Sequence, residues 1–344
     1  SMIKVGGAAA LMTVAILGLS ACGGGDQGPS ATQEAAEFVV YSGRSEELVG
    51  PLIEQFETAT GVQTEVRYGD TAELAAQLLE EGDNSPADVF FAQDAGALQV
   101  VQDEGLTTPL PADVVKKVPA MFRSADNQWV GTSGRARVIV YNTERVPADE
   151  VPKTVFELTE PQWKGQVGIA PTNASFQAFV TAMRVTVGEE RTKEWLEGLI
   201  ANDVQTFENN LAILDAVNAG TVEVGLANHY YWYEKAAEIG EENLKARNAA
   251  FEPGDVGNLV NVAGVAILPT GTDNAASEQF VEFLLSDEAQ QYFADVTAEY
   301  PLVKGVAARD DLPPLSEIDG PDLTLDQLAD LRGTQDLLLQ VGLL

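Results

Sequence analysis

From Phe38 onwards, short runs of β-branched and aromatic residues alternate with segments whose apolar positions repeat every three or four residues. The first run, FVVY (38–41), is typical of a buried strand. The segment after it begins at Ser45, a residue type that often caps a helix, and carries an apolar face before Gly61. This alternation predicts βαβ units and a mainly parallel sheet, and therefore an α/β protein.

The same alternation continues to the end of the chain. Further strands are expected at 62–68, 88–92, 137–142, 166–170, 204–207, 222–227 and 260–268. Helices are expected from Asp70 to Gly82, from Asp94 to Gly105, after Asn173, at 194–199, 277–285 and 288–295, and near the C-terminus.

Two of the expected strands, RVIVYN (137–142) and VNVAGVAIL (260–268), stand where a chain would cross between two lobes and return. They predict a discontinuous lobe, 38–140 with 264–344, and an inserted lobe, 141–263, each a mainly parallel sheet flanked by helices. Ligands of such sheets bind at the carboxyl ends of the strands, against helix N-termini. We therefore expect the ligand cleft between the lobes, lined by loops that join strands to helices.

The N-terminal segment has the pattern of a signal peptide. An apolar run from Ala8 to Leu19 is too short to span a bilayer and ends in Leu19-Ser20-Ala21-Cys22, which resembles the bacterial lipobox. We expect residues 1–22 to be the signal peptide, Cys22 the lipid attachment site and residues 23–37 a flexible tether. The protein is then extracytoplasmic and held at the cell membrane by its lipid alone; the alternative is a cysteine left over from the apolar run.

Charge and cysteine content exclude several classes of partner and chemistry. Twenty Lys and Arg against 53 Asp and Glu give a formal net charge of −33, so nucleic acid and anionic membranes are poor partners. We interpret the acidic surface as a solubility feature. Because Cys22 is the only cysteine, a disulfide within the chain and a thiol nucleophile in the folded body are both excluded.

After the strand VEVGLA (222–227) the sequence reads Asn228-His229-Tyr230-Tyr231-Trp232-Tyr233. Taken alone, this run suits an aromatic cluster in the core. Its context is more specific, because seven phrases in order along the chain resemble the periplasmic ferric-ion-binding proteins of bacterial iron ABC transporters. The phrases are VVYSGRSE, GDTAEL, EEGDNSPADVFFAQDAG, SGRARVIVYN, PQWKGQVGIA, ANHYYWY and AEYPL.

This resemblance implies a type II periplasmic-binding-protein fold and a receptor that delivers Fe(III) to an ABC permease. It also implies a monomer without enzymatic activity. The family's paired tyrosine ligands correspond to Tyr230 and Tyr231; a phenolate is a hard oxygen donor, and Fe(III) can displace a phenolic proton well below the usual pKa of about 10. Trp232 and Tyr233 are assigned to packing, and His229 to the surroundings of the ligands or to the surface.

The chain departs from the family at three positions. Many members place a histidine in the first strand-to-helix loop and a glutamate after the third strand, where this chain has Ser45 and Gln93. Another branch has a third tyrosine where this chain has Phe176. Two tyrosines cannot complete an octahedral iron site, so water or an exogenous anion such as carbonate, phosphate or citrate is expected to fill the rest.

Basic residues near the predicted cleft suit such an anion. Arg44 precedes a helix start, and Arg135 and Arg137 project to one face if that segment is extended. The alternative for each arginine is an ion pair with Asp88, Asp94 or Glu46. The resemblance adds further residues around the anion, namely Gln93, Asp94, Asn173, Ala174, Ser175, Asn210 and Asn228.

Two other functions remain to be separated from ferric-ion capture. A receptor of the same kind could bind an organic anion, a phosphonate or a ferric chelate without direct ligation of iron by tyrosine. A secreted hydrolase has little support, because the single histidine has no recognisable nucleophile partner and neither GxSxG nor HExxH occurs.

Overall fold

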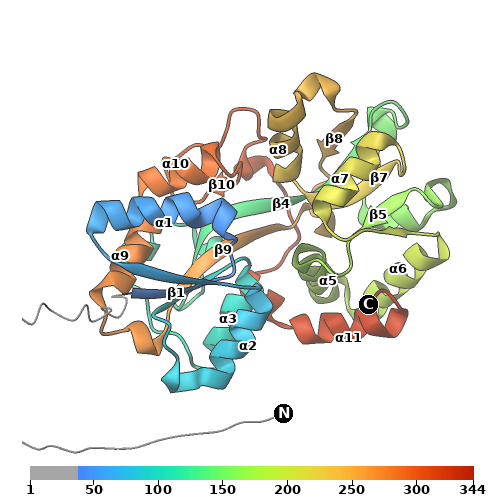
Figure 1. Ribbon diagram of the computed structural model, residues 1–344. Coiled ribbons are helices and arrows are strands. Elements are labelled where there is room, and N and C mark those ends of the chain that lie inside the picture. Colours follow the sequence, from blue (N-terminus) through green and yellow to red (C-terminus); the bar gives the residue numbers. More distant parts are fainter. Residues whose placement is uncertain (1–37) are drawn as a thin grey trace, which may run out of the picture. The chain divides into compact units, whose positions relative to one another are not determined.

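The computed structural model describes residues 38–344. The predicted signal peptide, the predicted lipid attachment site Cys22 and the predicted tether at 23–37 lie outside the described residues. Residues from Phe38 onwards alternate between strands and helices, as the hydrophobic pattern predicts (Figure 1).

Strands of the described chain form one mixed sheet of ten strands, ordered β2-β1-β3-β9-β4-β7-β5-β6, with β10 and β8 also paired to β4. Their bounds are β1 (Phe38–Ser42), β2 (Thr64–Tyr68), β3 (Val89–Ala92), β4 (Val130–Asn142), β5 (Val167–Ile169), β6 (Gln205–Thr206), β7 (Val224–Asn228), β8 (Ala246–Ala249), β9 (Val260–Ile267) and β10 (Tyr300–Pro301).

The two ends of this sheet are parallel and its middle is antiparallel. At one end β1 pairs in parallel with β2 and β3, and at the other β5 pairs in parallel with β6 and β7. The long strands β4 and β9 lie between them and pair antiparallel with each other. The predicted parallel order therefore holds at the ends, while the crossing strands differ because the chain returns through β9 in the direction opposite to β4.

Strand β4 is longer than predicted and is shared by both parts of the sheet. It begins at Val130 and ends at Asn142, pairing with β9 and β10 through its first part and with β7 and β8 through its second. Its register against β9 shifts between Gly131 and Ser133, which marks a bulge. In Figure 1, β4 and β9 run between the β1–β3 side and the β5–β7 side.

Eleven α-helices connect the strands of the described chain. They are α1 (Glu46–Thr60), α2 (Thr71–Glu81), α3 (Ala95–Asp103), α4 (Ala112–Val115), α5 (Ala174–Val187), α6 (Glu189–Ala201), α7 (Asn210–Ala219), α8 (Tyr230–Ile239), α9 (Ala275–Leu284), α10 (Asp287–Asp295) and α11 (Leu331–Val341).

Helix starts follow the predicted caps at three positions. The side chains of Asp70, Asp94 and Asn173 accept backbone N–H groups at the starts of α2, α3 and α5. Ser45 stands before α1 with an extended backbone, but its side chain makes no capping hydrogen bond. Gly61 ends α1 with a φ of 73°, a conformation that glycine adopts without the cost of a side chain.

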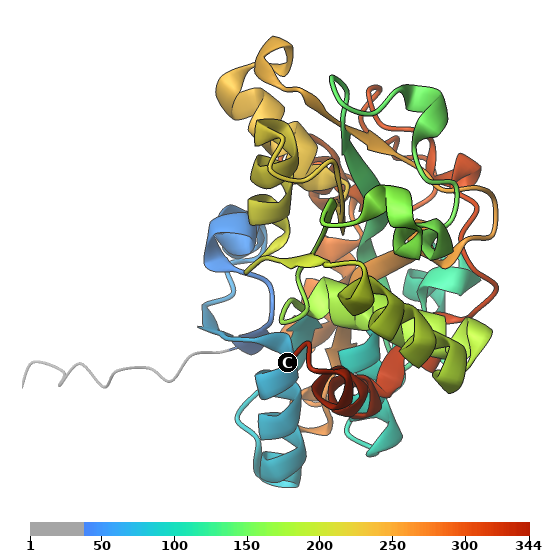
Figure 2. The same ribbon diagram turned by 90° about the vertical axis from the view of Figure 1, so that its right-hand side faces the viewer.

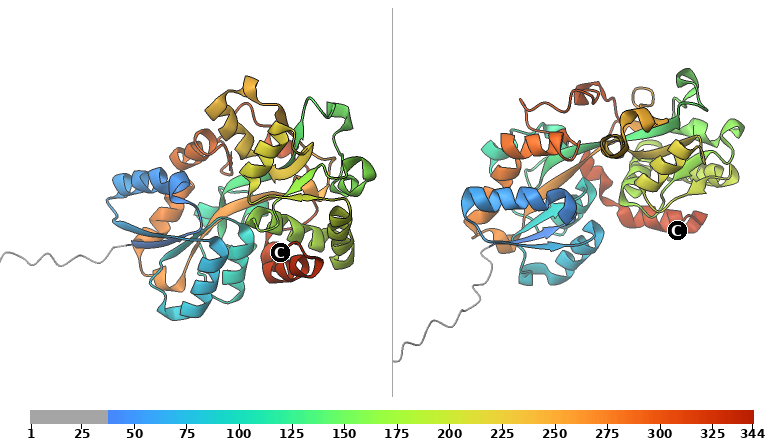
Figure 3. Two further views of the ribbon diagram at one scale, coloured as in Figure 1. Left: turned by 45° about the vertical axis from the view of Figure 1, so that its right-hand side comes forward. Right: turned by 45° about the horizontal axis from the view of Figure 1, so that its top comes forward.

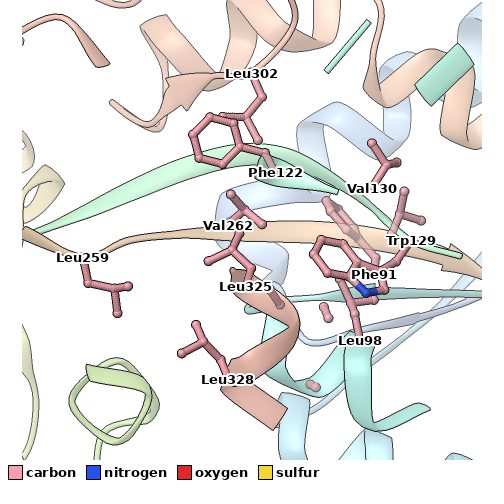
Figure 4. Close-up of a cluster of buried hydrophobic side chains, with 14 of the residues drawn as sticks. Phe91, Leu98, Phe122, Trp129, Val130, Leu259, Val262, Leu302, Leu325 and Leu328 are labelled. Carbon is pink, nitrogen blue, oxygen red and sulfur yellow. The ribbon is translucent and has the colours of Figure 1, made fainter. Parts of the chain in front are cut away.

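Two clusters of buried apolar side chains hold the sheet and its helices in the described chain. Figure 4 shows Phe91 of β3, Leu98 of α3, and Trp129 beside β4 among buried side chains of the crossing region. On the outer side of β1, the Phe56 and Phe280 rings lie 5.2 Å apart between centroids, which joins α1 to α9. The strand ends that carry the polar loops are thereby held on a rigid support.

The C-terminal segment crosses from α3 to α5 and α6. The 3₁₀ segment η10 (Leu325–Ala329) packs on α3, and α11 packs on α5 and α6 (Figures 2 and 3). A Cβ at Gly96 would stand 2.5 Å from the Leu328 carbonyl oxygen, so this approach requires glycine. The Thr181 and Thr334 hydroxyls are 2.6 Å apart in the contact of α5 with α11.

No helix within residues 38–344 is long and apolar enough to cross a membrane.

Candidate functional site

A cavity of about 130 Å³ opens where several strand ends meet helix starts. Its lining contains every predicted metal or anion residue except Arg44. The lining residues are Gln93, Asp94, Arg135, Arg137, Asn173, Ala174, Ser175, Asn210, Asn228, Tyr230, Tyr231, Leu259 and Asn261.

Six separate segments bring these residues together, namely the loops after β3, β5 and β7, strand β4, the start of α7 and the start of β9. Gln93 and Asp94 follow β3 and precede α3, and Asn173 follows β5 and precedes α5. Asn228 ends β7, directly before the helix that carries the tyrosines. Because β3 runs opposite to β5 and β7 in the mixed sheet, the carboxyl ends of these strands face each other across β4 and β9, and segments distant in sequence meet there. Strand β4 contributes Arg135 and Arg137 to the lining.

The two tyrosines are close together at the start of α8. Their hydroxyl oxygens are 3.2 Å apart and their ring centroids 4.4 Å apart. Consecutive side chains of a strand would point to opposite faces, but the backbone is already helical at His229, with φ −63° and ψ −37°. Tyr230 is 8% exposed, and burial raises the pKa of its phenol. Without a ligand, the buried Tyr230 is therefore a neutral phenol.

Arg137 faces the tyrosines from β4. Its Nη1 donates to Ser175 Oγ at 3.3 Å, to Asn210 Oδ1 at 3.4 Å and to Asn228 Oδ1 at 3.2 Å. Within residues 38–344, its buried Nη2 has no hydrogen-bond partner. Burial lowers the pKa of the guanidinium to about 10, so the group is still cationic at neutral pH. Arg137 therefore brings positive charge and free donor capacity to the cavity.

Arg135 stands two residues earlier on the same face of β4 and is 5% exposed. Its Nη2 donates to the Gln93 carbonyl oxygen, while its buried Nη1 has no partner within the described chain. Asp94 is half-buried, and desolvation of its carboxyl raises its pKa, although Arg135 and the N–H groups at the start of α3 oppose this shift. The confirmed extension of β4 thus places two arginines on one side of the cavity.

Amide and hydroxyl side chains complete the wall next to Arg137. Asn210 Nδ2 donates to Ser175 Oγ at 2.9 Å, and Asn173 Oδ1 accepts Ser175 N–H at 2.9 Å. These contacts fix the start of α5 against the start of α7. The backbone amides of the α5 start then lie beside the guanidinium, where an anion would find both kinds of donor.

The sequence analysis predicted Arg44 as an anion-binding residue, but the structure does not place it in the cavity lining. Its Nη2 lies 2.8 Å from Glu299 Oε1 and its Nη1 donates to Ser133 Oγ at 3.0 Å. The side chain is 1% exposed. The partner is none of the three acids considered from the sequence, and Arg44 is already committed to an internal ion pair. We therefore remove it from the anion-binding set.

The other positions that depart from the family have separate locations. Ser45 is exposed at the start of α1, and Phe176 is fully buried in the core of α5. Within residues 38–344, no group of three or more His, Cys, Asp or Glu side chains could hold a metal ion.

His229 is buried, which excludes the predicted alternative of a surface residue. It is 3% exposed, its Nδ1 accepts the Ala136 N–H at 3.1 Å, and its Nε2 donates to the Ala298 carbonyl at 2.7 Å. Burial lowers its pKa to about 4, so the imidazole is neutral at physiological pH. Trp232 and Tyr233 are both buried, as their assignment to packing predicts.

Two lining residues, Leu259 and Asn261, are absent from the sequence-based set. Both lie at the start of β9, where Asn261 Oδ1 accepts the Val262 N–H at 2.8 Å. The available signal was a single amide side chain within an otherwise apolar crossing strand. A crossing strand passes the cleft, so a polar residue at its start is a candidate for the lining.

Comparisons with known proteins identify the family of this chain. The family model described as bacterial extracellular solute-binding protein matches residues 84–320. The major ferric iron-binding protein of Neisseria meningitidis serogroup B is 33% identical over 91% of this chain and 95% of its own length. Iron uptake protein A1 of Synechocystis is 32% identical over 90% of this chain and 88% of its own.

Solved structures show the same fold. Iron-bound HitA from Pseudomonas aeruginosa superposes with a TM-score of 0.83 at 33% identity, covering 89% of this chain and 99% of that one. A Trichodesmium protein in complex with iron and citrate ligands gives a TM-score of 0.78 at 29% identity, with the same coverage. The resemblance to ferric-ion-binding proteins and the two-lobed α/β fold are thereby confirmed. The chain belongs to the bacterial extracellular solute-binding protein family.

Proposed function

We propose that this protein captures Fe(III) through the phenolate oxygens of Tyr230 and Tyr231 and delivers it to an ABC importer. The observation that carries the proposal is the tyrosine pair, whose oxygens are 3.2 Å apart on a cavity that two buried arginines also line. Oxygens at adjacent corners of an octahedron, each about 2.0 Å from a metal, lie about 2.8 Å apart. A small movement would thus let both phenolates bind one ion.

The electrostatics of the site favour a cation of high charge over one of low charge. Burial raises the pKa of Tyr230, so its proton leaves only if a stronger positive charge replaces it. Fe(III) is a hard trivalent cation that prefers anionic oxygen, which fits a phenolate pair better than softer ions. The relatives named for ferric iron support this cargo.

We further propose that an exogenous anion completes the iron site. Two tyrosines leave most of an octahedral shell open, while Arg135 and Arg137 each carry a guanidinium nitrogen without a partner in the described chain. A guanidinium presents a planar fork that suits carbonate, phosphate or a carboxylate such as citrate. The Trichodesmium structure with iron and citrate supports such a pairing of metal and anion.

The rest of the proposal concerns transport. Lobe 1 would comprise 38–140 and 264–344, and lobe 2 would comprise 141–263; the two would close over iron and anion before the complex meets the permease. The N-terminal segment would be cleaved before Cys22, and a lipid on that cysteine would hold the protein at the cell membrane through the tether at 23–37. The function is binding and delivery by a monomer, without turnover.

An absorption titration tests the proposed cargo. The mature protein would be titrated with a ferric chelate, with and without bicarbonate, and a phenolate-to-iron charge-transfer band should appear in the visible range. Binding of ferric citrate without such a band would favour a receptor for an intact chelate. Binding of a free organic anion or a phosphonate, again with no band, would favour an anion receptor.

A further inference from the structure

His229 occupies an irregular position in the ladder between β4 and β7. Arg137 is paired with Asn228, so the next residue of each strand places Ala136 opposite His229. In a regular antiparallel pair of this kind the two residues exchange two N–H···O=C bonds. Here the His229 N–H donates to the Ala136 carbonyl at 2.9 Å, but the Ala136 N–H donates to His229 Nδ1 at 3.1 Å. The imidazole replaces the carbonyl of its own residue.

The replaced carbonyl has turned away because the chain enters α8 at this residue. It accepts Asn248 Nδ2 at 2.9 Å, from strand β8. Without the imidazole, the turn into the helix would leave the buried Ala136 N–H unpaired, and a buried unpaired N–H is costly. The side chain of His229 therefore allows the strand to end and the helix to begin without loss of a ladder bond.

The same residue determines how the site's two halves lie relative to each other. Ala136 is the residue between Arg135 and Arg137, and His229 directly precedes Tyr230. Two hydrogen bonds to one residue, Ala136, define both the distance and the angle between β4 and the start of α8. The third bond, from Nε2 to the Ala298 carbonyl at 2.7 Å, fixes the tautomer and the plane of the ring.

We propose that His229 is a positioning residue that couples the tyrosine pair to the arginine pair, so that iron and anion bind cooperatively. The inference rests on the proposed function, since it assigns the tyrosines to iron and the arginines to the anion. His229 contacts neither ligand; it acts by fixing the Ala136 peptide against the first turn of α8. The coupling ratio, defined as iron affinity with bicarbonate divided by iron affinity without it, measures this role.

Three substitutions test the two side-chain hydrogen bonds of His229, one at a time and together. His229→Asn keeps an acceptor at the position of Nδ1 and can still pair with the Ala136 N–H. His229→Gln reaches only the Ala298 carbonyl, and His229→Phe keeps ring volume but neither bond. We expect the coupling ratio to fall about five- to tenfold in the Phe and Gln variants, because both lack the hydrogen bond from the Ala136 N–H. The Asn variant should stay within about twofold of wild type.

The position of the charge-transfer band gives a second readout, because it reports the geometry of the phenolates around iron. It should shift in the Phe and Gln variants and not in the Asn variant. Tyr233→Phe is the matched control: it removes a hydrogen bond to the Asp311 carbonyl, 3.1 Å long, from the same helix. We expect this control to lower the melting temperature and to leave ratio and band unchanged.

The outcomes distinguish the two proposals. A wild-type protein without a band or without anion dependence would overturn the proposed function and this inference together. A wild-type protein with both, combined with unchanged ratio and band in the Phe and Gln variants, would overturn the inference alone. If the Phe variant does not fold, the comparison of Gln with Asn decides, since both are neutral amides, one methylene apart in length, and each restores a different bond.

Discussion

Arg44 and Glu299 form an almost fully buried ion pair, with 2.8 Å between Nη2 and Oε1 and 1% exposure of each side chain. Glu299 also accepts hydrogen bonds from Ser133 at 2.9 Å and from Thr297 at 2.8 Å. Burial alone would raise the pKa of Glu299, but the charges of Arg44 and Arg135 outweigh it and hold the pKa below its usual value. The pair thus joins the loop after β1 to strand β4 and to the segment before β10.

Removal of Arg44 should therefore destabilise the fold. Arg44→Ala leaves a buried carboxylate without its main partner, and breaking such pairs costs about 3–5 kcal/mol. Urea unfolding followed by circular dichroism measures the loss. The control is Arg67→Ala, whose pair with Glu65 is nearly half exposed and should contribute less than about 1 kcal/mol.

The folded fraction of Arg44→Ala should keep its anion dependence, since the side chain does not line the cavity. A variant of normal stability that has lost the effect of bicarbonate on iron affinity would contradict the structural assignment. It would restore Arg44 to the anion-binding set predicted from the sequence.

Each tyrosine of the pair should be needed for the visible band. Tyr230→Phe and Tyr231→Phe each remove one phenolate, so each variant should lose or strongly weaken the band in a ferric titration. Tyr233→Phe lies in the same helix turn, outside the cavity lining, and should keep the full band. Full absorption in both variants of the pair would show that iron is not bound by these oxygens.

Iron affinity should rise with pH if both phenols lose their protons on binding. Burial raises the pKa of Tyr230, so this tyrosine stays protonated throughout the neutral range and must release its proton to the solvent. Two released protons imply up to about a hundredfold gain in affinity per pH unit. Competition with a chelator of known protonation constants between pH 6 and 8 measures the slope. A flat profile would argue against ligation by two phenols.

Periodicity predicted the parts of the site that depend on local geometry. The alternation of a strand placed Arg135 and Arg137 on one face, and the capping residues Asp94 and Asn173 marked two helix starts that now flank the cavity. The tyrosine pair came from the family resemblance, because the composition of this run alone favoured an aromatic cluster in the core. The chain reversal at β9 and the early start of β4 arise from strand pairing, which local periodicity does not encode.

The error at Arg44 has a different origin. Its partner Glu299 is 255 positions away in sequence, and their contact depends on how β10 and its preceding turn return to β4. The position of Arg44 in a loop before a helix suggested that it binds an anion. In the folded protein its guanidinium is already paired with the carboxylate of Glu299. Asn261 was missed for the converse reason, since a crossing strand becomes part of the cleft only once both sides of the sheet are assembled.

Asp255 should make stability depend on pH. Its burial, with Glu252 and Glu157 nearby, raises the pKa of the carboxyl to about 6 against an ordinary value of 3.8, although the Gly257 N–H opposes the shift. Because the folded pKa is raised, the contribution is fully favourable below pH 4 and is lost as pH rises through 6.

Asp255→Asn mimics the protonated acid and removes this dependence. Relative to the variant, the free energy of unfolding of wild type should fall by about 1 kcal/mol between pH 4 and 7, after allowance for solvent screening. Urea unfolding of both proteins at several pH values measures the difference. A constant difference over that range would mean that the carboxyl titrates normally in the folded state.

The proposed anion site is tested most cleanly at Arg137. Its three partners, Ser175, Asn210 and Asn228, are neutral, so Arg137→Met leaves no buried charge unpaired. Arg135→Met is a less specific test, because the charge of Arg135 lowers the pKa of both Asp94 and Glu299, and its removal would alter these carboxylates as well.

A charge-assisted hydrogen bond contributes about 1.5–3 kcal/mol, or about ten- to a hundredfold in affinity. Iron affinity of Arg137→Met should fall by that factor in bicarbonate or citrate and change little in anion-free buffer, where the contact is not made. Isothermal titration with a ferric chelate in matched buffers gives both values. If wild-type iron affinity were the same with and without every small anion, the open coordination positions would have to be filled by water, and the two arginines would serve only to balance the charge of Asp94 and the phenolates.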